Sequence, residues 1–169
     1  ISAAAELLRI GNPNEAQVRT SSNIIGRQVR HMTRLVDDLL DVSRVTRGLI
    51  TLERVQVGMR GVVQEAVEQV RPAVDARRQR LSVSLPPSWA RVEGDKARLV
   101  QVVANVLGNA TKYTPEACAI DLRAEVRSGT LVISVRDEGI GMEPELTRRV
   151  FDLFTQAERS SDRSQGGLG

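Results

Sequence analysis

Apolar residues recur at helical spacing in the first part of the chain. They predict one helix over 1–10, ended by the Gly-Asn-Pro at 11–13, and a second helix over about 14–47. In the second helix the apolar positions advance by four, three, four and three residues: Ile25, Val29, Met32, Val36 and Leu39. This step is typical of the seam of a coiled coil or helix bundle. Because one hairpin cannot bury such a seam, we expect residues 1–47 to pair with a second copy as a dimeric four-helix bundle.

From residue 48 onward the chain mixes strand and helix periods. Alternating apolar and polar residues predict four strands, at 49–57, 81–85, 120–126 and 131–135. Helical spacing predicts three helices, at 59–79, 95–113 and 144–150. Asp95 is a suitable N-cap, and Ser128 with Gly129 is a suitable hairpin turn. We therefore expect an α+β protein in which a helical hairpin (1–47) precedes an α/β sandwich (48–169), whose mixed sheet carries helices on one face.

Composition excludes several kinds of protein. With 2% aromatic residues the core must be aliphatic, and a single cysteine, Cys118, excludes a disulfide framework or a cysteine-rich zinc site. The net charge of +3 is carried almost entirely by arginines interleaved with acids, so we expect no nucleic-acid partner. No run approaches the roughly 20 apolar residues of a membrane span, so we expect no direct membrane contact. The single cysteine suits a reducing compartment such as the cytoplasm, where we expect the chain to lie. The parent protein can still be membrane-tethered.

Two glycines follow a carboxylate at the end of the strand predicted at 131–135. In the segment from Asp137 to Gly141, Gly139 and Gly141 turn the backbone sharply. Glycines there let a planar ligand or a phosphate approach the main chain, and the carboxylate is a suitable acceptor for an exocyclic amine. By itself this pattern also fits a polar turn with no ligand.

Three polar residues share one face of the helix predicted at 95–113. Asn105, Asn109 and Lys112 are spaced by four and three residues. An amide oxygen is a suitable ligand for Mg²⁺, which keeps water and substrate phosphates as its other ligands, and a lysine adds charge beside those phosphates. A solvated polar stripe is the alternative. We expect the apolar residues around them to face the core: Val102, Val103, Val106 and Leu107.

The last residues are glycine-rich. Gly166 to Gly169 follow a polar stretch that contains Arg159 and Arg163. Backbone amides of such a run can cradle phosphates, and an arginine can pair with a phosphate oxygen. Alone, the run fits a disordered tail better than a phosphate-binding loop.

The joint order of these segments resembles the nucleotide-binding domain of sensor histidine kinases, within the Bergerat-fold ATPase superfamily. Residues 105–113 resemble the family's N box, 137–141 its G1 box, 151–154 its F box and 166–169 the first half of its G2 box. Residues 1–47 resemble the rear part of the dimerisation and phosphotransfer hairpin. Because both ends lie inside such patterns, we expect a fragment incomplete at its N-terminus and its C-terminus.

The resemblance implies ATP and Mg²⁺ as ligands and a role for each matching residue. Asp137 would bond the adenine amine, in a pocket that the two glycines after it shape. Asn109 would ligate Mg²⁺ with support from Asn105. Charge, stacking and a mobile lid over ATP would come from five further residues: Lys112, Arg163, Tyr113, Gly167 and Gly169.

The resemblance also implies a reaction. The γ-phosphoryl group would pass to a histidine and then to an aspartate of a response-regulator receiver domain. Hydrolases of the superfamily place a general-base glutamate where this chain has Asn105, and an amide cannot take a proton from water. Asn105 therefore favours histidine transfer over an ATPase. His31 lies on the second helix rather than the first, so we expect the acceptor to be absent from this chain. A non-catalytic dimeric scaffold is the other alternative.

Overall fold

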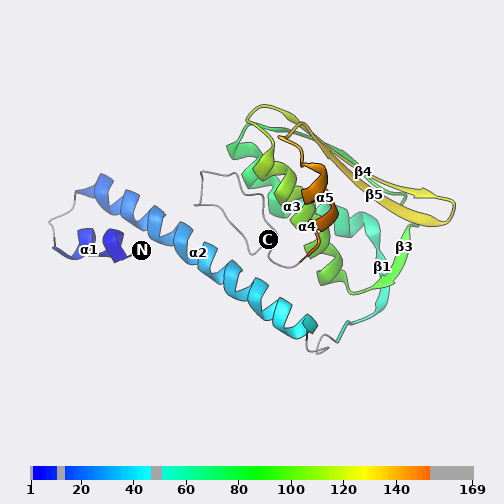
Figure 1. Cartoon of the computed structure of the whole chain (residues 1–169), viewed down its shortest axis with the longest axis horizontal. Coiled ribbons are helices and arrows are strands. Elements are labelled where there is room, and N and C mark those ends of the chain that lie inside the picture. The colour runs from blue at the N-terminus through cyan, green and yellow to red at the C-terminus, as the bar shows by residue number, and fades with distance from the viewer. Residues whose placement is uncertain (1, 11–13, 47–50, 153–169) are drawn as a thin grey trace. The chain divides into compact units, whose positions relative to one another are not determined.

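Ten helices and strands make up the part of the chain that the structure describes. Figure 1 shows them in a computed structural model, which describes residues 2–10, 14–46 and 51–152. In order they are α1 (Ser2–Ile10), α2 (Glu15–Thr46), β1 (Val55–Gly58), α3 (Met59–Ala76), β2 (Arg80–Ser84), β3 (Arg91–Gly94), α4 (Lys96–Tyr113), β4 (Ala119–Arg127), β5 (Thr130–Asp137) and α5 (Pro144–Arg149). The chain divides into two compact units, residues 1–50 with 144–169, and residues 51–143. The predicted domain boundary between residues 47 and 48 stays a prediction.

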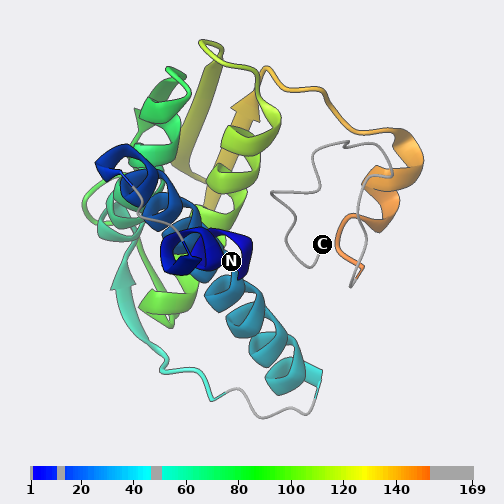
Figure 2. The ribbon, with the colours of Figure 1, turned by 90° about the vertical axis from the view of Figure 1, so that its left-hand side faces the viewer.

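The first unit contains a helical hairpin. The short α1 folds back beside the longer α2 (Figures 1 and 2). Several apolar residues of the predicted seam are exposed in the single chain, among them Met32 at 55% and Val36 at 54%. The hairpin thus leaves an apolar stripe uncovered by any residue that the structure describes. None of the described helices has the length and apolarity needed to span a bilayer.

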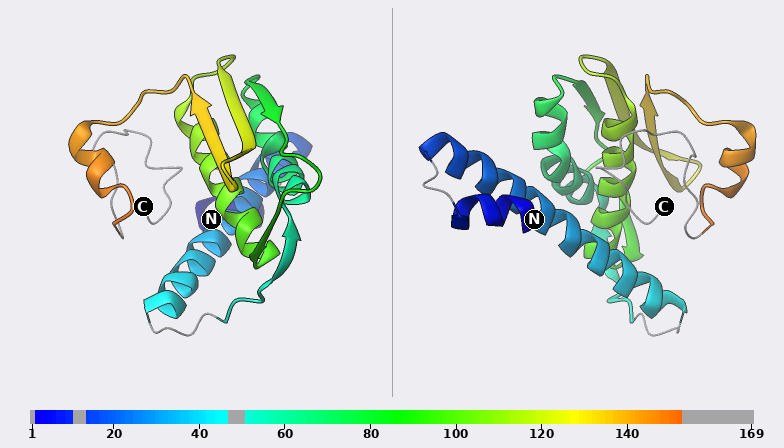
Figure 3. Two further views of the ribbon diagram at one scale, coloured as in Figure 1. Left: turned by 90° about the vertical axis from the view of Figure 1, so that its right-hand side faces the viewer. Right: turned by 60° about the vertical axis from the view of Figure 1, so that its left-hand side comes forward.

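The second unit is a mixed sheet backed by two helices. β2 pairs parallel with β4, with Leu81 opposite Ile120, and β4 pairs antiparallel with β5, with Leu122 opposite Val135. α3 and α4 lie on one face of this sheet, as Figure 3 shows, where β4 and β5 are yellow and α4 is green. This arrangement confirms the predicted fold class.

Two details of the strands differ from the prediction. The strand predicted at 49–57 is only β1, because residues 51–54 are not extended into a ladder, and 49–50 lie outside the described residues. β1 pairs antiparallel with a second strand, β3, which the alternation did not reveal because it holds a single partly buried apolar residue, Val92. The predicted hairpin turn is confirmed, with positive φ at Ser128 and Gly129.

The core is aliphatic, as the composition predicts. It lies between the helices and the sheet, and its members are Val57, Met59, Val62, Val63, Ala66, Val67, Val70, Val74, Val100, Val103, Leu107, Ala110, Ile120, Leu122 and Ala124. An ion pair of 2.7 Å between Lys96 Nζ and Glu65 joins α4 to α3 outside this core. This ion pair is solvent-exposed, so the packing of α4 against α3 and β5 rests on the buried core rather than on the pair.

Candidate functional site

The carboxylate of Asp137 lies at the end of β5 and is fixed through one of its two oxygens. Its Oδ1 accepts a hydrogen bond from the Gly139 amide at 2.8 Å and one from the Thr114 hydroxyl at 3.4 Å. Asp137 is exposed, and Oδ2 accepts no hydrogen bond from any residue within 2–10, 14–46 or 51–152. An oriented carboxylate with one open oxygen fits an exocyclic amine such as that of adenine.

Gly139 is required by close packing rather than by backbone conformation. A Cβ at this position would lie 2.4 Å from Asp137 Oδ1 and 2.8 Å from the Tyr113 carbonyl oxygen. Gly141 differs, because its φ of +70° favours glycine while the space around it is open. The two glycines therefore serve different purposes: the first lets the turn approach α4, and the second lets the chain leave it.

The turn after β5 is bonded to the end of α4. The amide of Ile140 donates to the carbonyl oxygen of Tyr113 at 3.3 Å. Tyr113 is one helical turn beyond Asn109, so both residues lie on the same side of α4, and both are exposed. Lys112 Nζ lies 4.8 Å from the centre of the Tyr113 ring. The structure thus brings the predicted Asp137 turn to the end of the helix face that carries the predicted amides.

The outward face of α4 carries amides and apolar side chains together. Asn105 and Asn109 are exposed, and the side chain of neither makes a hydrogen bond to a residue that the structure describes. The prediction that Val102 and Val106 face the core is wrong: they are 60% and 47% exposed. The face of α4 that packs against the core instead consists of Val100, Val103, Leu107, Ala110 and Thr111.

The amides fit Mg²⁺ by chemistry. Amide oxygens are suitable ligands for Mg²⁺, which takes few protein ligands and completes its shell with water and phosphate. Among the described residues no group of three or more histidine, cysteine or acidic side chains could hold a metal. The assignment of Asn105 and Asn109 as ligands of an ion carried in with a nucleotide stays a prediction.

Several predicted site residues lie outside the described residues. They are Arg163, Gly167 and Gly169, together with Phe154 of the predicted F box. His31 belongs to α2, as predicted. The roles expected for these residues stay predictions.

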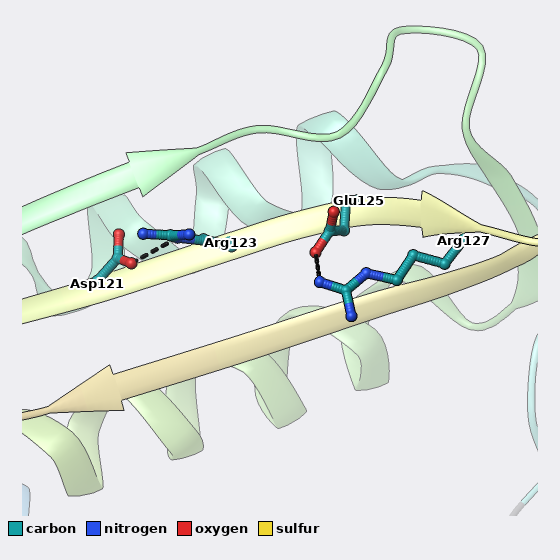
Figure 4. A network of polar contacts seen from close by, with 4 residues as sticks. All are labelled: Asp121, Arg123, Glu125 and Arg127. Carbon is teal, nitrogen blue, oxygen red and sulfur yellow. Dashed lines mark hydrogen bonds and ion pairs between the residues drawn. The ribbon is translucent and has the colours of Figure 1, made fainter.

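An open groove of about 450 Å³ lies on the opposite face of the sheet. Ser82 and Ser84 of β2 line it beside four charged residues of β4: Asp121, Arg123, Glu125 and Arg127. Figure 4 shows that the charges of β4 neutralise one another in pairs, Arg123 with Asp121 at 2.7 Å and Arg127 with Glu125. Because these groups satisfy each other, we do not assign the nucleotide to this groove.

Comparisons with known proteins identify the family of the chain. A family model described as "Histidine kinase-, DNA gyrase B-, and HSP90-like ATPase" matches residues 94–169, from the last residue of β3 to the last glycine. The Circadian input-output histidine kinase CikA of Thermosynechococcus vestitus is 32% identical over 173 residues, covering 100% of this chain and 24% of that protein. The chain carries the ATP-binding catalytic domain of a sensor histidine kinase.

Solved structures show the same fold for this kinase domain. Histidine kinase AdeS of Acinetobacter baumannii matches with a TM-score of 0.71 at 22% identity, over 90% of this chain and 74% of that one. Full-length ShkA in complex with AMPPNP matches with a TM-score of 0.68 at 27% identity, over 89% of this chain and 32% of that one. Histidine kinase ThkA in complex with response regulator protein TrrA matches with a TM-score of 0.66 at 20% identity, over 88% of this chain and 42% of that one. The chain spans about a quarter or less of the first curated relatives that it matches.

Sequence reasoning missed the contacts that hold the candidate site together. Thr114 follows the predicted N box and bonds Asp137 through its hydroxyl, and Ile140, within the predicted G1 box, bonds Tyr113 through its amide. Arg77 and Gln79, more than thirty residues earlier, bond the carbonyls at the end of α4. No periodicity marks such contacts, because they depend on how α3 and α4 pack in three dimensions.

Proposed function

We propose that this chain binds ATP with Mg²⁺ and that the longer protein transfers the γ-phosphoryl group to a histidine. The proposal rests mainly on one observation. The open oxygen of Asp137 lies on a turn bonded to the end of the α4 face that carries Asn105 and Asn109. An acceptor for adenine and two amides suited to a phosphate-bound ion are thus presented from neighbouring backbone.

In this proposal Asp137 accepts a hydrogen bond from the adenine amine through Oδ2. Gly139 fixes the carboxylate by donating its amide to Oδ1, and the Thr114 hydroxyl supports the same oxygen. Gly141 shapes the far side of the pocket. The ring of Tyr113, 42% exposed beside this turn, packs against the nucleotide.

The phosphate end is assigned to the other predicted residues. Mg²⁺ supplies charge neutralisation of the phosphates when it is bound. Asn109 would hold the ion with support from Asn105, and Lys112 orients the phosphate chain by its positive charge. Arg163, Gly167 and Gly169 complete the proposal as a phosphate contact and as hinge glycines of a lid. Catalysis then consists mainly of positioning and charge stabilisation.

The acceptor follows from the residue at position 105. Water or an alcohol must lose a proton to attack a γ-phosphate, which calls for a general base at the site. Asn105 cannot accept that proton, whereas the neutral imidazole of a histidine attacks through a free lone pair. We therefore favour a histidine kinase over a hydrolase of the same superfamily.

We further propose two protein partners. A second copy covers the exposed stripe of α2, which contains Val29, Met32 and Val36. A response-regulator receiver domain accepts the phosphoryl group on an aspartate, an inference supported by the likeness to the ThkA fold, which is described in complex with the response regulator TrrA. The predicted cytoplasmic location belongs with this proposal.

A phosphate-release experiment tests the reaction class. The chain is given ATP and Mg²⁺ at concentrations that saturate binding, and inorganic phosphate is followed over many hours. A histidine kinase domain that lacks its acceptor binds the nucleotide without continuing release of phosphate. Steady release by the chain, lost in Asp137→Asn, would instead establish a hydrolase.

The non-catalytic scaffold makes a different prediction. In that case the chain dimerises through α2 but binds ATP–Mg²⁺ no better than Asp137→Asn does. The intact set of Asp137, Gly139, Gly141 and Asn109 favours the kinase over the scaffold.

A further inference from the structure

Two side chains at the end of α3 turn toward the C-terminal end of α4. Arg77 is the C-cap of α3, and Arg78 has a positive φ of 52° that closes the turn. The backbone amide of Gln79 bonds back to the Val74 carbonyl at 3.1 Å. Gln79 is only 7% exposed although it is polar. A buried amide usually has hydrogen-bond partners, and here the Nε2 end has them, whereas Oε1 has none among the described residues.

Both side chains donate to carbonyl oxygens at the end of α4. Arg77 donates from Nη1 to Thr111, Lys112 and Thr114, at 2.7, 2.9 and 3.1 Å. Gln79 donates from Nε2 to Thr111 and Thr114, at 3.1 and 2.8 Å. The last carbonyls of a helix have no partner within the helix, and a positive charge near them is favourable. The Thr114 amide bonds the Ala110 carbonyl, and the carbonyls beyond Ala110 are capped by these two side chains from the segment just after α3.

The remaining carbonyls show what this cap is joined to. Gln79 also donates to Pro115 at 3.3 Å, whereas the Tyr113 carbonyl accepts from Ile140 in the turn after Asp137. Every carbonyl from Thr111 to Pro115 thus accepts a hydrogen bond: Arg77 or Gln79 donates to four of these carbonyls, and Ile140 donates to that of Tyr113. Residues 111–115 are therefore held between the side chains of Arg77 and Gln79 on one side and the turn after Asp137 on the other.

We propose that Arg77 and Gln79 are positioning residues of the nucleotide site. They fix the carbonyl direction of residues 111–115, and this places the Tyr113 carbonyl and the Thr114 hydroxyl where the Asp137 turn binds them. This inference rests on the proposed function, since it concerns the same ATP site. Arg77 has the larger effect because its donor is charged.

The test compares variants at these positions with matched controls. Arg77→Gln removes the charge, Arg77→Lys keeps it, and Gln79→Leu removes the amide. Arg71→Ala removes an exposed arginine from the same helix, and Val63→Ala lowers stability from the core, where Val63 is 0% exposed. Two quantities are measured: hydrogen exchange of the Gly139 and Ile140 amides without nucleotide, and the Kd for ATP–Mg²⁺ at a temperature where every variant is folded.

We expect Arg77→Gln to speed exchange at Gly139 and Ile140 by roughly tenfold and to raise the Kd by a similar factor, and Gln79→Leu to change both in the same direction by a smaller factor. Arg77→Lys should change the exchange rates and the Kd less than Arg77→Gln does, whereas Arg71→Ala should leave the exchange rates and the Kd unchanged. Val63→Ala lowers the Tm without a selective change at the turn, so a merely structural role predicts that Arg77→Gln behaves like it.

The outcomes separate the two proposals. If the wild-type chain binds ATP–Mg²⁺ but the variants at positions 77 and 79 have the same exchange rates and Kd as Arg71→Ala, the positioning role alone is overturned. Failure of the wild-type chain to bind ATP–Mg²⁺ overturns the proposed function, and this role with it.

Discussion

The amide of Ile140 donates a hydrogen bond to the carbonyl oxygen of Tyr113 over 3.3 Å, and this bond joins the two halves of the proposed nucleotide site. Tyr113 ends α4, whose outward face carries Asn105 and Asn109. Ile140 belongs to the turn that fixes Asp137. Because the bond joins backbone atoms, the position of Asp137, the proposed adenine acceptor, relative to the two asparagines depends on the packing of α4 against β5.

Substitution of Gly139 tests how closely this turn approaches α4. Gly139→Ala would place a methyl group 2.4 Å from Asp137 Oδ1 and 2.8 Å from the Tyr113 carbonyl oxygen, so the turn must shift. We expect ATP–Mg²⁺ affinity to fall by about tenfold or more, measured by calorimetric titration. Gly61→Ala is the matched control, because no heavy atom lies within 4 Å of its new methyl group on α3. It should raise the free energy of unfolding by about 0.5–1 kcal/mol with unchanged affinity. Equal affinities in the two variants would contradict the account of the turn.

The metal assignment predicts a loss of magnesium dependence. If Asn109 holds the ion, ATP binds the wild-type chain more tightly with Mg²⁺ than with a chelator, and Asn109→Ala abolishes that difference. Asp137→Asn is the complementary variant, because it weakens binding under both conditions. Titrations of both variants with and without Mg²⁺ measure the effect. A full magnesium effect retained in Asn109→Ala would show that the ion is held elsewhere.

The apolar stripe of α2 predicts an assembly that a single charge disrupts. Val36 is 54% exposed in the single chain, so Val36→Glu adds no buried charge to the monomer. In a dimer that covers the stripe the same glutamate would be buried without a partner, and the dimer Kd should rise by about a hundredfold or more. Sedimentation velocity measures the change. Arg27→Glu alters the charge on an exposed position of the same helix and should leave assembly intact. Monomeric wild-type chain at high concentration would refute this interface.

The start of α4 contributes a pH dependence to stability. Hydrogen bonds from the backbone amides of Arg98 and Glu53 lower the pKa of the Asp95 carboxyl from its ordinary 3.8. Because the folded-state pKa is below the unfolded one, the unfolded chain binds more protons near pH 4. The stabilisation is therefore complete above the unfolded pKa and is lost as the pH falls through the folded pKa.

Thermal unfolding of Asp95→Asn checks this dependence. Asparagine still caps a helix but carries no charge, so the Tm difference from wild type should be largest at neutral pH and should shrink below about pH 4. Asp75→Asn removes an exposed carboxylate of α3 and serves as the control. A Tm difference that is constant from pH 3 to pH 7 would contradict the assignment.

The arrangement of the elements could be predicted because most of them depend on local patterns. The α2 seam, the α3 stripe and the hairpin turn at Ser128 follow from apolar spacing and from turn chemistry. β3 was not predicted because its four residues contain only one apolar side chain, which cannot form an alternating pattern. Val102 and Val106 were placed wrongly because the apolar residues of α4 surround most of the helix, so their spacing does not show which side meets the sheet.

The site was predictable in its residue types but not in its connections. Asp137, Gly139 and Asn109 belong to motifs whose order can be read along the chain. The contacts of Arg77, Gln79 and Thr114 join atoms that are far apart in sequence, and only the packing of α3, α4 and β5 brings them together.

Titration of the chain and of Asp137→Asn with ATP–Mg²⁺ tests the central claim most directly. Either orientation of the asparagine amide loses a contact, because its nitrogen must face the adenine amine or the Gly139 amide. We predict saturable binding by the wild-type chain and an affinity lower by about ten- to a hundredfold in Asp137→Asn. Equal affinities, or no saturable binding by the wild-type chain, would contradict the assignment of this site to ATP.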